Sequence, residues 1–219
     1  GASPNDTVTV TGDAIANAPG LVQIRINTGN GADNLNVTAD VLPAPLPAAP
    51  LFILDAGIGT DALTFTSNAE LIRLDDANQR IDIGTLASAG SLGQISLVNL
   101  TGEDVTVQGG TGDNTFDLSA WSNGARAVVD GGGEGVNGDT LIGLDDNNIW
   151  DITGENSGDV GLFQFSDVEN LTGGSRDDLF RLSGGTLDGP IDGGNITGVA
   201  VNFSNANPDM ITRTDGGSW

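Results

Sequence analysis

The chain has 219 residues, of which thirty are acidic and seven are arginine, and it contains no lysine, histidine, cysteine or tyrosine. Its net charge of -23 would repel phosphates and anionic membranes and would concentrate cations, so nucleic acid is excluded as a partner. Thirty-four glycines, without an apolar stretch of about 18 residues, argue against helical bundles and membrane insertion, and the lack of cysteine excludes a disulfide or thiolate-zinc scaffold.

The first predicted elements are two short strands at residues 7–11 and 21–26, where β-branched or aliphatic residues alternate with polar ones. A glycine-containing turn follows at 26–29. In the strand after this turn, Leu35 and Val37 are two positions apart and therefore point to the same side.

Residues 41–52 contain four prolines. Proline lacks a backbone donor and fixes φ, so this segment is predicted to leave the sheet as an excursion. A proline-rich linker between two domains is the alternative. The segment is short and another glycine turn begins after it at Leu54, which favours a loop within one β-helix domain covering residues 1–219.

The glycine turn and its following strand recur along the chain. The clearest copy is residues 107–118, Val-Gln-Gly-Gly-Thr-Gly-Asp-Asn-Thr-Phe-Asp-Leu. Most copies continue with Asp or Asn, one spacer and an apolar residue, and a longer match relates residues 74–83 to 144–152. The repeat of about 20 to 28 residues indicates a solenoid. The aliphatic-x-small-Gly openings end at Gly29, Gly57, Gly110, Gly132, Gly174 and Gly194.

The sequence of the strands between these turns indicates the type of solenoid. A leucine-rich repeat would carry regular leucines and helical segments, whereas these units carry short β-type strands interrupted by Gly and Asp. We therefore expect an all-β fold, a right-handed parallel β-helix of about nine coils, with glycine at corners of positive φ. The residues predicted to point inward are Leu35, Val37, Leu63, Phe65, Ile81, Ile83, Val105, Val107, Phe116, Leu118, Trp150, Ile152, Phe180 and Leu182.

Residues 109–118, 168–173 and 171–178 resemble the β-helical repeats of giant bacterial secreted and surface proteins, the filamentous-haemagglutinin-like adhesins. Their Gly-Asp turns are also similar to the repeats-in-toxin nonapeptide, although here the copies recur every 20 or more residues instead of every nine. The resemblance implies a structural or adhesive segment of a large extracellular protein at the bacterial cell surface, without enzymatic activity.

Four aspartates are the candidate metal ligands. If the turns at Gly110 and Gly132 lie on adjacent coils, Asp113 and Asp139 come close together, and Asp177 with Asp178 offers a second site. Calcium prefers such oxygen ligands, so calcium is the expected cofactor. The alternative is that these side chains only cap turns and solvate the surface. The pairs 75–76 and 145–146 are weaker candidates because adjacent residues of a strand face opposite ways.

An enzyme is the main alternative function, because parallel β-helices also host polysaccharide lyases and hydrolases. Asp113 with Asp177 and Asp178 could supply two carboxylates for glycoside hydrolysis. The chain has no histidine or lysine to act as a base, which argues against it. A groove with clustered carboxylates and an exposed aromatic, such as Trp121 or Trp219, would favour a carbohydrate-active protein.

The two ends of the predicted rod suggest its partners. Residues 7–11 and 199–203 are β-prone and carry no charge, so neither resembles the charged or proline-containing edges that block strand addition. We therefore expect neighbouring coils or chains to continue the stack end to end. A cell-surface polysaccharide is a second expected partner.

Overall fold

The computed structural model describes residues 5–11, 24–39, 52–75, 78–86, 93–98, 104–121, 126–194 and 199–203. The predicted excursion 41–52 lies outside these ranges, except that Phe52 begins a strand. The described chain is all-β and contains no α-helix. Accordingly, its described part contains no helix with the length and hydropathy needed to span a membrane.

Most strands belong to two large sheets, here named the ten-stranded sheet and the nine-stranded sheet. In spatial order, the ten-stranded sheet consists of β1 (Thr7–Thr11), β4 (Asn34–Thr38), β7 (Ala62–Ser67), β11 (Asp104–Gly109), β13 (Ala127–Asp130), β17 (Phe163–Ser166), β16 (Ser157–Val160), β15 (Ile149–Gly154), β19 (Asp178–Leu182) and β21 (Val199–Phe203). The nine-stranded sheet consists of β2 (Ile24–Asn27), β5 (Phe52–Asp55), β10 (Gly93–Val98), β9 (Arg80–Gly84), β8 (Leu71–Asp75), β12 (Thr115–Asp117), β14 (Thr140–Ile142), β18 (Asn170–Thr172) and β20 (Ile191–Asp192). A small third sheet pairs β3 (Asn30–Gly31) with β6 (Ile58–Gly59).

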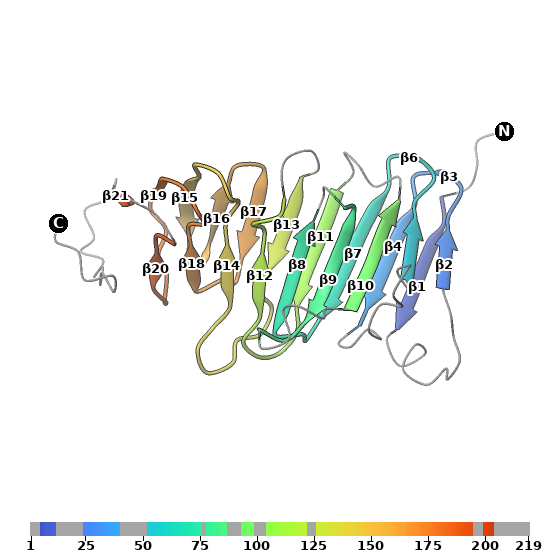
Figure 1. Cartoon of the computed structure of the whole chain (residues 1–219), viewed down its shortest axis with the longest axis horizontal. Coiled ribbons are helices and arrows are strands. Elements are labelled where there is room, and N and C mark those ends of the chain that lie inside the picture. Colours follow the sequence, from blue (N-terminus) through green and yellow to red (C-terminus); the bar gives the residue numbers. More distant parts are fainter. Residues whose placement is uncertain are drawn as a thin grey trace.

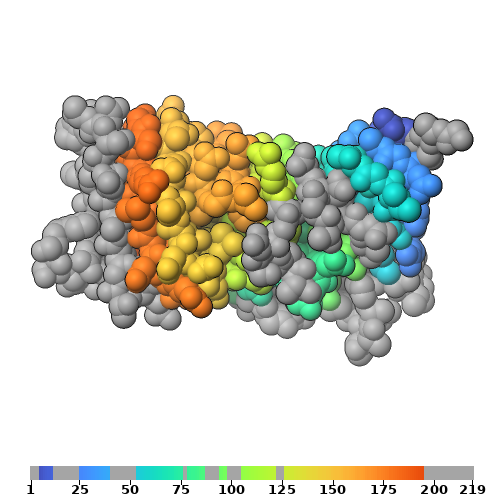
Figure 2. All heavy atoms as spheres, turned by 90° about the horizontal axis from the view of Figure 1, so that it is seen from above, coloured from blue at the N-terminus to red at the C-terminus, as the bar shows by residue number. Residues whose placement is uncertain are grey.

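The strands lie side by side across the long axis of the molecule (Figure 1). The sequence advances along this axis, from blue at one end to red at the other (Figure 2). The chain alternates between the sheets, so that β4 is followed by β5 in the nine-stranded sheet and then by β7 beside β4. Parallel register places like residues next to each other, for example Leu35 beside Leu63 and Val37 beside Phe65.

A single cluster of buried apolar residues from both sheets forms the core. Strand β7 shows why: its residues alternate between half-buried and buried, because successive side chains of a strand point to opposite faces. All fourteen residues predicted to point inward are buried, with 5% or less of each side chain exposed. The period-two interpretation of these strands is therefore confirmed.

The sheets are mixed, because the chain doubles back in two places. From β7 it passes to β8 and returns through antiparallel β9 and β10, and β10 then pairs in parallel with β5. After β14 it passes to β15 and returns through antiparallel β16 and β17, and β17 pairs in parallel with β13. We call β8–β10 and β15–β17 the two meanders. They depart from the purely parallel stacking expected from the repeat.

The meanders also correct the internal match between residues 74–83 and 144–152. The first segment forms a hairpin, in which β8 pairs with β9 within the nine-stranded sheet. The second segment leaves β14 of the nine-stranded sheet and enters β15 of the ten-stranded sheet. The two segments therefore share a sequence pattern but not a conformation, because packing outside each segment selects its path.

The glycines that end the repeated turns have the expected backbone role at five of six positions. Gly29, Gly57, Gly132, Gly174 and Gly194 have φ between +74° and +123°. Gly110 does not belong to this set, and Gly112 carries the positive φ in that turn, at +126°. Turns also stack on one another: a Cβ added to Gly57 would lie 1.6 Å from the carbonyl oxygen of Gly29.

Candidate functional site

In the part of the chain that the structure describes, a buried polar residue stands at the beginning of seven strands, and we call these the strand-start residues. Each belongs to the same face as the apolar residue two positions later, so its side chain enters the body of the molecule. Each is at most 6% exposed. The strand-start residues are Asp33, Asp61, Asn114, Asp139, Asn148, Glu169 and Asp178.

Side chains of the strand-start residues bind the backbone of the neighbouring strand. Asp61 Oδ1 accepts a hydrogen bond from the backbone N–H of Asp33 at 2.9 Å. In the nine-stranded sheet, Asp139 Oδ1 accepts from the N–H of Asn114 at 2.6 Å, and Glu169 Oε2 accepts from the N–H of Asp139 at 2.7 Å. These ladders satisfy backbone donors where the strands begin, which is the capping role considered for the acidic residues.

Asn148 and Asp178 form the same pair on β15 and β19. Asp178 Oδ1 accepts from the backbone N–H of Asn148 at 2.9 Å and from its Nδ2 at 2.7 Å. Asn148 Nδ2 also donates to the carbonyl oxygen of Gly173 at 2.8 Å. An amide at this position can thus donate a hydrogen bond to a carbonyl oxygen of the next turn, whereas a carboxylate has no proton to donate.

Asp139 occupies a comparable position with a carboxyl group. Its Oδ2 is buried and has no hydrogen-bond partner among the described residues. A Cβ added to Gly131 would lie 1.6 Å from the Asp167 carbonyl oxygen and 2.6 Å from Asp139 Oδ2, so the three groups meet at one turn. Burial raises the pKa of Asp139 to about 7; the N–H of Asn114 opposes this rise, and the nearby charges of Glu169 and Asp113 add to it.

The pKa of Asp113 shifts in the opposite direction to that of Asp139, because the Asp113 carboxyl group lies at the surface and accepts several hydrogen bonds. Its Oδ1 accepts from the backbone N–H groups of Asn137 and Gly138 at 3.0 and 3.1 Å, and its Oδ2 accepts from Asn137 Nδ2 at 2.7 Å. The backbone and side-chain hydrogen bonds from Asn137 lower the pKa of Asp113 below its usual range. Asp113 therefore remains an anion that holds the 131–139 loop.

The four predicted metal ligands thus lie in different environments. Asp113 and Asp139 stand on neighbouring turns, but one carboxyl group is at the surface and the other is in the interior. Asp177 is exposed while Asp178 is buried, so the adjacent pair faces opposite sides. Burial raises the pKa of Asp178. The described residues contain no group of three or more acidic side chains arranged to hold a metal ion.

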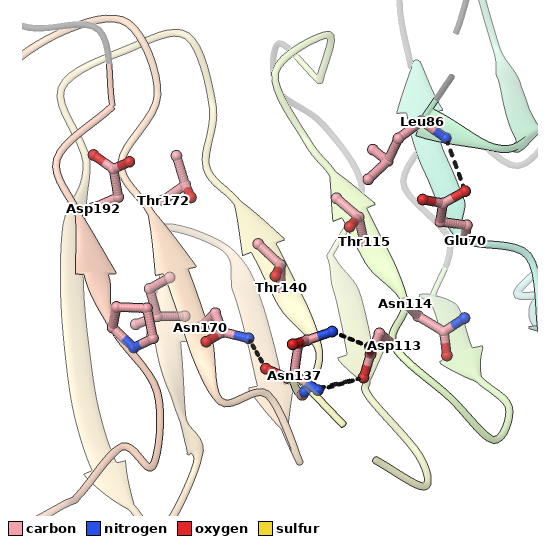
Figure 3. A pocket seen from close by; sticks show the side chains of 13 residues that line it. Glu70, Leu86, Asp113, Asn114, Thr115, Asn137, Thr140, Asn170, Thr172 and Asp192 are labelled. Carbon is pink, nitrogen blue, oxygen red and sulfur yellow. Dashed lines mark hydrogen bonds between the residues drawn. The ribbon is translucent and has the colours of Figure 1, made fainter. Parts of the chain in front are cut away.

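A groove of about 580 Å³ lies on the outer face of the nine-stranded sheet. Figure 3 shows Thr115 and Thr140 on successive strands, with Thr172 further along and the hydrogen-bonded pair Asp113 and Asn137 to one side. Its lining combines hydroxyl, amide and carboxyl groups with an apolar surface of similar extent. The lining residues are Glu70, Leu86, Asp113, Asn114, Thr115, Asn137, Gly138, Thr140, Asn170, Leu171, Thr172, Pro190 and Asp192.

The groove does not meet the criterion for a carbohydrate-active surface. Its carboxylates Glu70, Asp113 and Asp192 lie apart across the groove instead of clustering (Figure 3), and no aromatic residue among the described residues lines it. Trp121 is 5% exposed and packs edge-on against Phe163, with 5.7 Å between ring centroids, so it belongs to the core and offers no stacking platform. Trp219 lies outside the described residues. Asp177 and Asp178 do not line the groove with Asp113.

Two features escaped the sequence argument although signals for them exist. Asn148 and Glu169 each precede a spacer and an apolar residue, as Asp139 does, and this pattern marks strand-start residues. The sequence signal for the groove is the set of threonines Thr115, Thr140 and Thr172, each next to an inward-pointing apolar residue. Comparison with protein-family models, curated proteins and solved structures found no match.

Proposed function

We propose that this chain is a rigid, non-enzymatic structural or adhesive segment of a large extracellular bacterial protein, built as one right-handed parallel β-helix domain of about nine coils with two meanders. The observation that carries the proposal is the stack of in-register strands along one axis, with strand-start side chains bonding successive strands. Such a stack is long and stiff, as a spacer at a cell surface must be.

End-to-end continuation is the second element of this proposal. Strand β1 occupies one end of the ten-stranded sheet and pairs with β4 on its other side. It carries no charge along 7–11, so it suits the addition of another strand. The expected partner is a further coil or a second chain, and screening of the net charge of -23 by salt should promote the contact.

Two copies of the chain fused head to tail test the spacer role. Small-angle X-ray scattering should give a maximum dimension close to twice that of one copy and a scattering profile of a stiff rod. A profile of two bodies moving freely about the junction would contradict end-to-end stacking. Single copies compared at low and high salt provide the control for association between molecules.

Calcium remains our proposed stabilising ion. Support comes from the strongly acidic composition and from Asp113 and Asp139 on neighbouring turns, with Asp177 and Asp178 as the second pair. Calcium should raise the melting temperature more than magnesium does, because an ion that binds only the folded state stabilises it by mass action. The excess should disappear in Asp113→Ala with Asp139→Ala or in Asp177→Ala with Asp178→Ala. Equal effects of both ions on the unmodified chain would reduce calcium to charge screening.

A further inference from the structure

The groove on the nine-stranded sheet crosses strands instead of following one. Thr115 pairs in register with Thr140, and Thr140 pairs in register with Asn170. The next outward row continues from Thr172 to Asp192 on β20. Neighbouring strands are about 4.8 Å apart, so hydroxyl and amide groups repeat at that interval along the molecule. A regular row of this kind matches a linear ligand that repeats its own polar groups at a similar interval, as an extended sugar chain does.

The charge of the groove narrows the class of ligand. Glu70, Asp113 and Asp192 line it, and within the described ranges no arginine does. The hydrogen bonds that lower the pKa of Asp113 keep this group anionic over the ordinary pH range. Nucleic acids and sugar chains rich in carboxylate or sulfate are therefore repelled, both locally and by the net charge of the whole chain. Neutral sugars, or sugars that carry amines, are compatible with these groups.

The side chains of the groove lining indicate how it would recognise a sugar. No ring from the described part of the chain offers a stacking face there, so the directional contacts are hydrogen bonds with hydroxyl, amide and carboxyl groups. Such contacts are individually modest because they replace hydrogen bonds to water. Repetition along a polymer compensates, since several weak contacts on one chain act together.

We propose that this groove binds a linear neutral or amine-bearing polysaccharide laid across β12, β14 and β18. The inference rests on the adhesive role proposed above and identifies the surface that performs it. The sugar chain runs along the long axis of the molecule. Its hydroxyl groups exchange hydrogen bonds with the row formed by Thr115, Thr140 and Asn170, and any amines lie beside the acidic residues.

Titration of the full chain with cellohexaose, a glucosamine hexamer and a galacturonate hexamer tests the proposal by calorimetry and by NMR amide shifts. The first or second sugar should bind and shift amides of β12, β14 and β18, while the anionic hexamer should not bind. Replacing Thr115→Val with Thr140→Val should weaken binding about tenfold, because two hydroxyl contacts are lost at nearly constant side-chain shape.

Thr64→Val with Thr106→Val is the matched control. These threonines are also register partners on neighbouring parallel strands, but they lie in the ten-stranded sheet, and their replacement should leave sugar binding within about twofold. Equal losses in both double variants, or failure of both the neutral and the amine-bearing hexamer to bind, would overturn the proposal. Binding of a polylysine peptide with neither sugar bound would instead assign the groove to cationic peptides. The shift map of the unmodified chain decides the matter if a variant does not fold, and the two-copy scattering experiment tests the rigid role separately.

Discussion

Both asparagine and aspartic acid occur among the strand-start residues, and the two side chains differ in donor capacity: the amide carries N–H donors, whereas an ionised carboxylate has none. Asn148 Nδ2 donates to the carbonyl oxygen of Gly173, whereas Asp139 Oδ2 is buried beside the Asp167 carbonyl without a donor. A protonated Asp139 could act as the amide does. Because burial raises its pKa to about 7, a substantial part of this group is protonated at neutral pH.

The first prediction is that Asp139→Asn raises stability at pH 8 and much less at pH 5 in calcium-free buffer. A raised folded-state pKa means that the stability from Asp139 is complete below its unfolded value near 4 and is lost as pH rises through about 7. The asparagine variant avoids this loss, whose upper bound is about 4 kcal/mol. Urea unfolding of both proteins at the two pH values measures the difference.

The exposed neighbour of another strand-start residue supplies the control for this prediction. Asp177→Asn removes a surface carboxylate next to Asp178 and should change stability by less than about 0.5 kcal/mol at either pH. A gain from Asp139→Asn that is the same at pH 5 and pH 8 would show that Asp139 does not titrate as its environment implies.

Two stacked glycines separate backbone strain from steric contact. Gly29 and Gly57 both have positive φ, at +94° and +85°, but nothing lies within 4 Å of a Cβ on Gly29. Gly29→Ala should therefore cost only the left-handed penalty of about 1–2 kcal/mol. Gly57→Ala should lose about 1–3 kcal/mol more, because its Cβ would collide with the Gly29 carbonyl. Denaturant unfolding of both variants tests this, and equal losses would contradict it.

At the residue scale, the sequence predicts the core better than the site. The alternation that placed Leu35 and Phe65 inside follows from strand geometry and needs no tertiary information. The same rule, applied two positions before Leu141, places Asp139 inside with it. The calcium prediction for Asp139 came from the glycine-turn sequence and did not use this rule. The hydrogen bonds that hold Asp113 could not be predicted, since they depend on how the 131–139 loop folds back.

Within the first meander, one arginine forms ion pairs with two nearly buried aspartates. Arg80 lies 3.1 Å from Asp75 and 3.1 Å from Asp82, whose side chains are 6% and 3% exposed. Burial raises the pKa of Asp82, and the Arg80 guanidinium opposes this rise. The β8–β9 hairpin is thus stabilised by a cation on its own second strand, β9.

Replacing Arg80→Gln should destabilise the protein by about 3 kcal/mol at pH 8, because it removes the nearest counter-ion of two buried carboxylates. The loss should be smaller at pH 5, where Asp82 can take up a proton more easily. Arg181→Gln is the matched control: its pair with Asp151 spans 3.5 Å with side chains 41% and 38% exposed, and should contribute less than about 1 kcal/mol. Chemical unfolding at both pH values gives these differences, and equal losses from the two variants would refute the role of Arg80.

Local sequence information does not determine how the strands are connected. Residues 74–83 and 144–152 carry the same order of leucine, acidic turn and buried apolar pair, yet one forms a hairpin and the other changes sheet. Both paths satisfy period-two burial, as Ile81 and Trp150 are each fully buried. The choice depends on which neighbouring strand edge is free when the segment packs, and the edge that β8 leaves is filled only by β9 and β10 later in the chain.

Over the whole molecule, the two meanders compensate each other. The first adds β9 and β10 to the nine-stranded sheet, so this sheet gains two strands relative to the other. The second adds β16 and β15 beyond β17, and the ten-stranded sheet recovers the same number. The sheets therefore end with nearly equal strand counts and can enclose one core along their full length.

This compensation predicts that removing both meanders harms the fold less than the two single removals would suggest. Because Leu74 and Ile95 both pair with Ile81, deleting residues 76–96 lets β8 replace β10 in register. Because Trp150 and Phe163 both pair with Val160, deleting residues 154–166 lets β15 replace β17. Each deletion alone removes two strands from one sheet while the other keeps its full number, so part of the core is exposed. The double deletion restores the match between the sheets. Its free energy of unfolding should therefore exceed, by more than about 1 kcal/mol, the value predicted by subtracting both single losses from that of the intact chain. Urea unfolding of the four proteins completes this cycle, and strict additivity would show that the meanders are independent insertions.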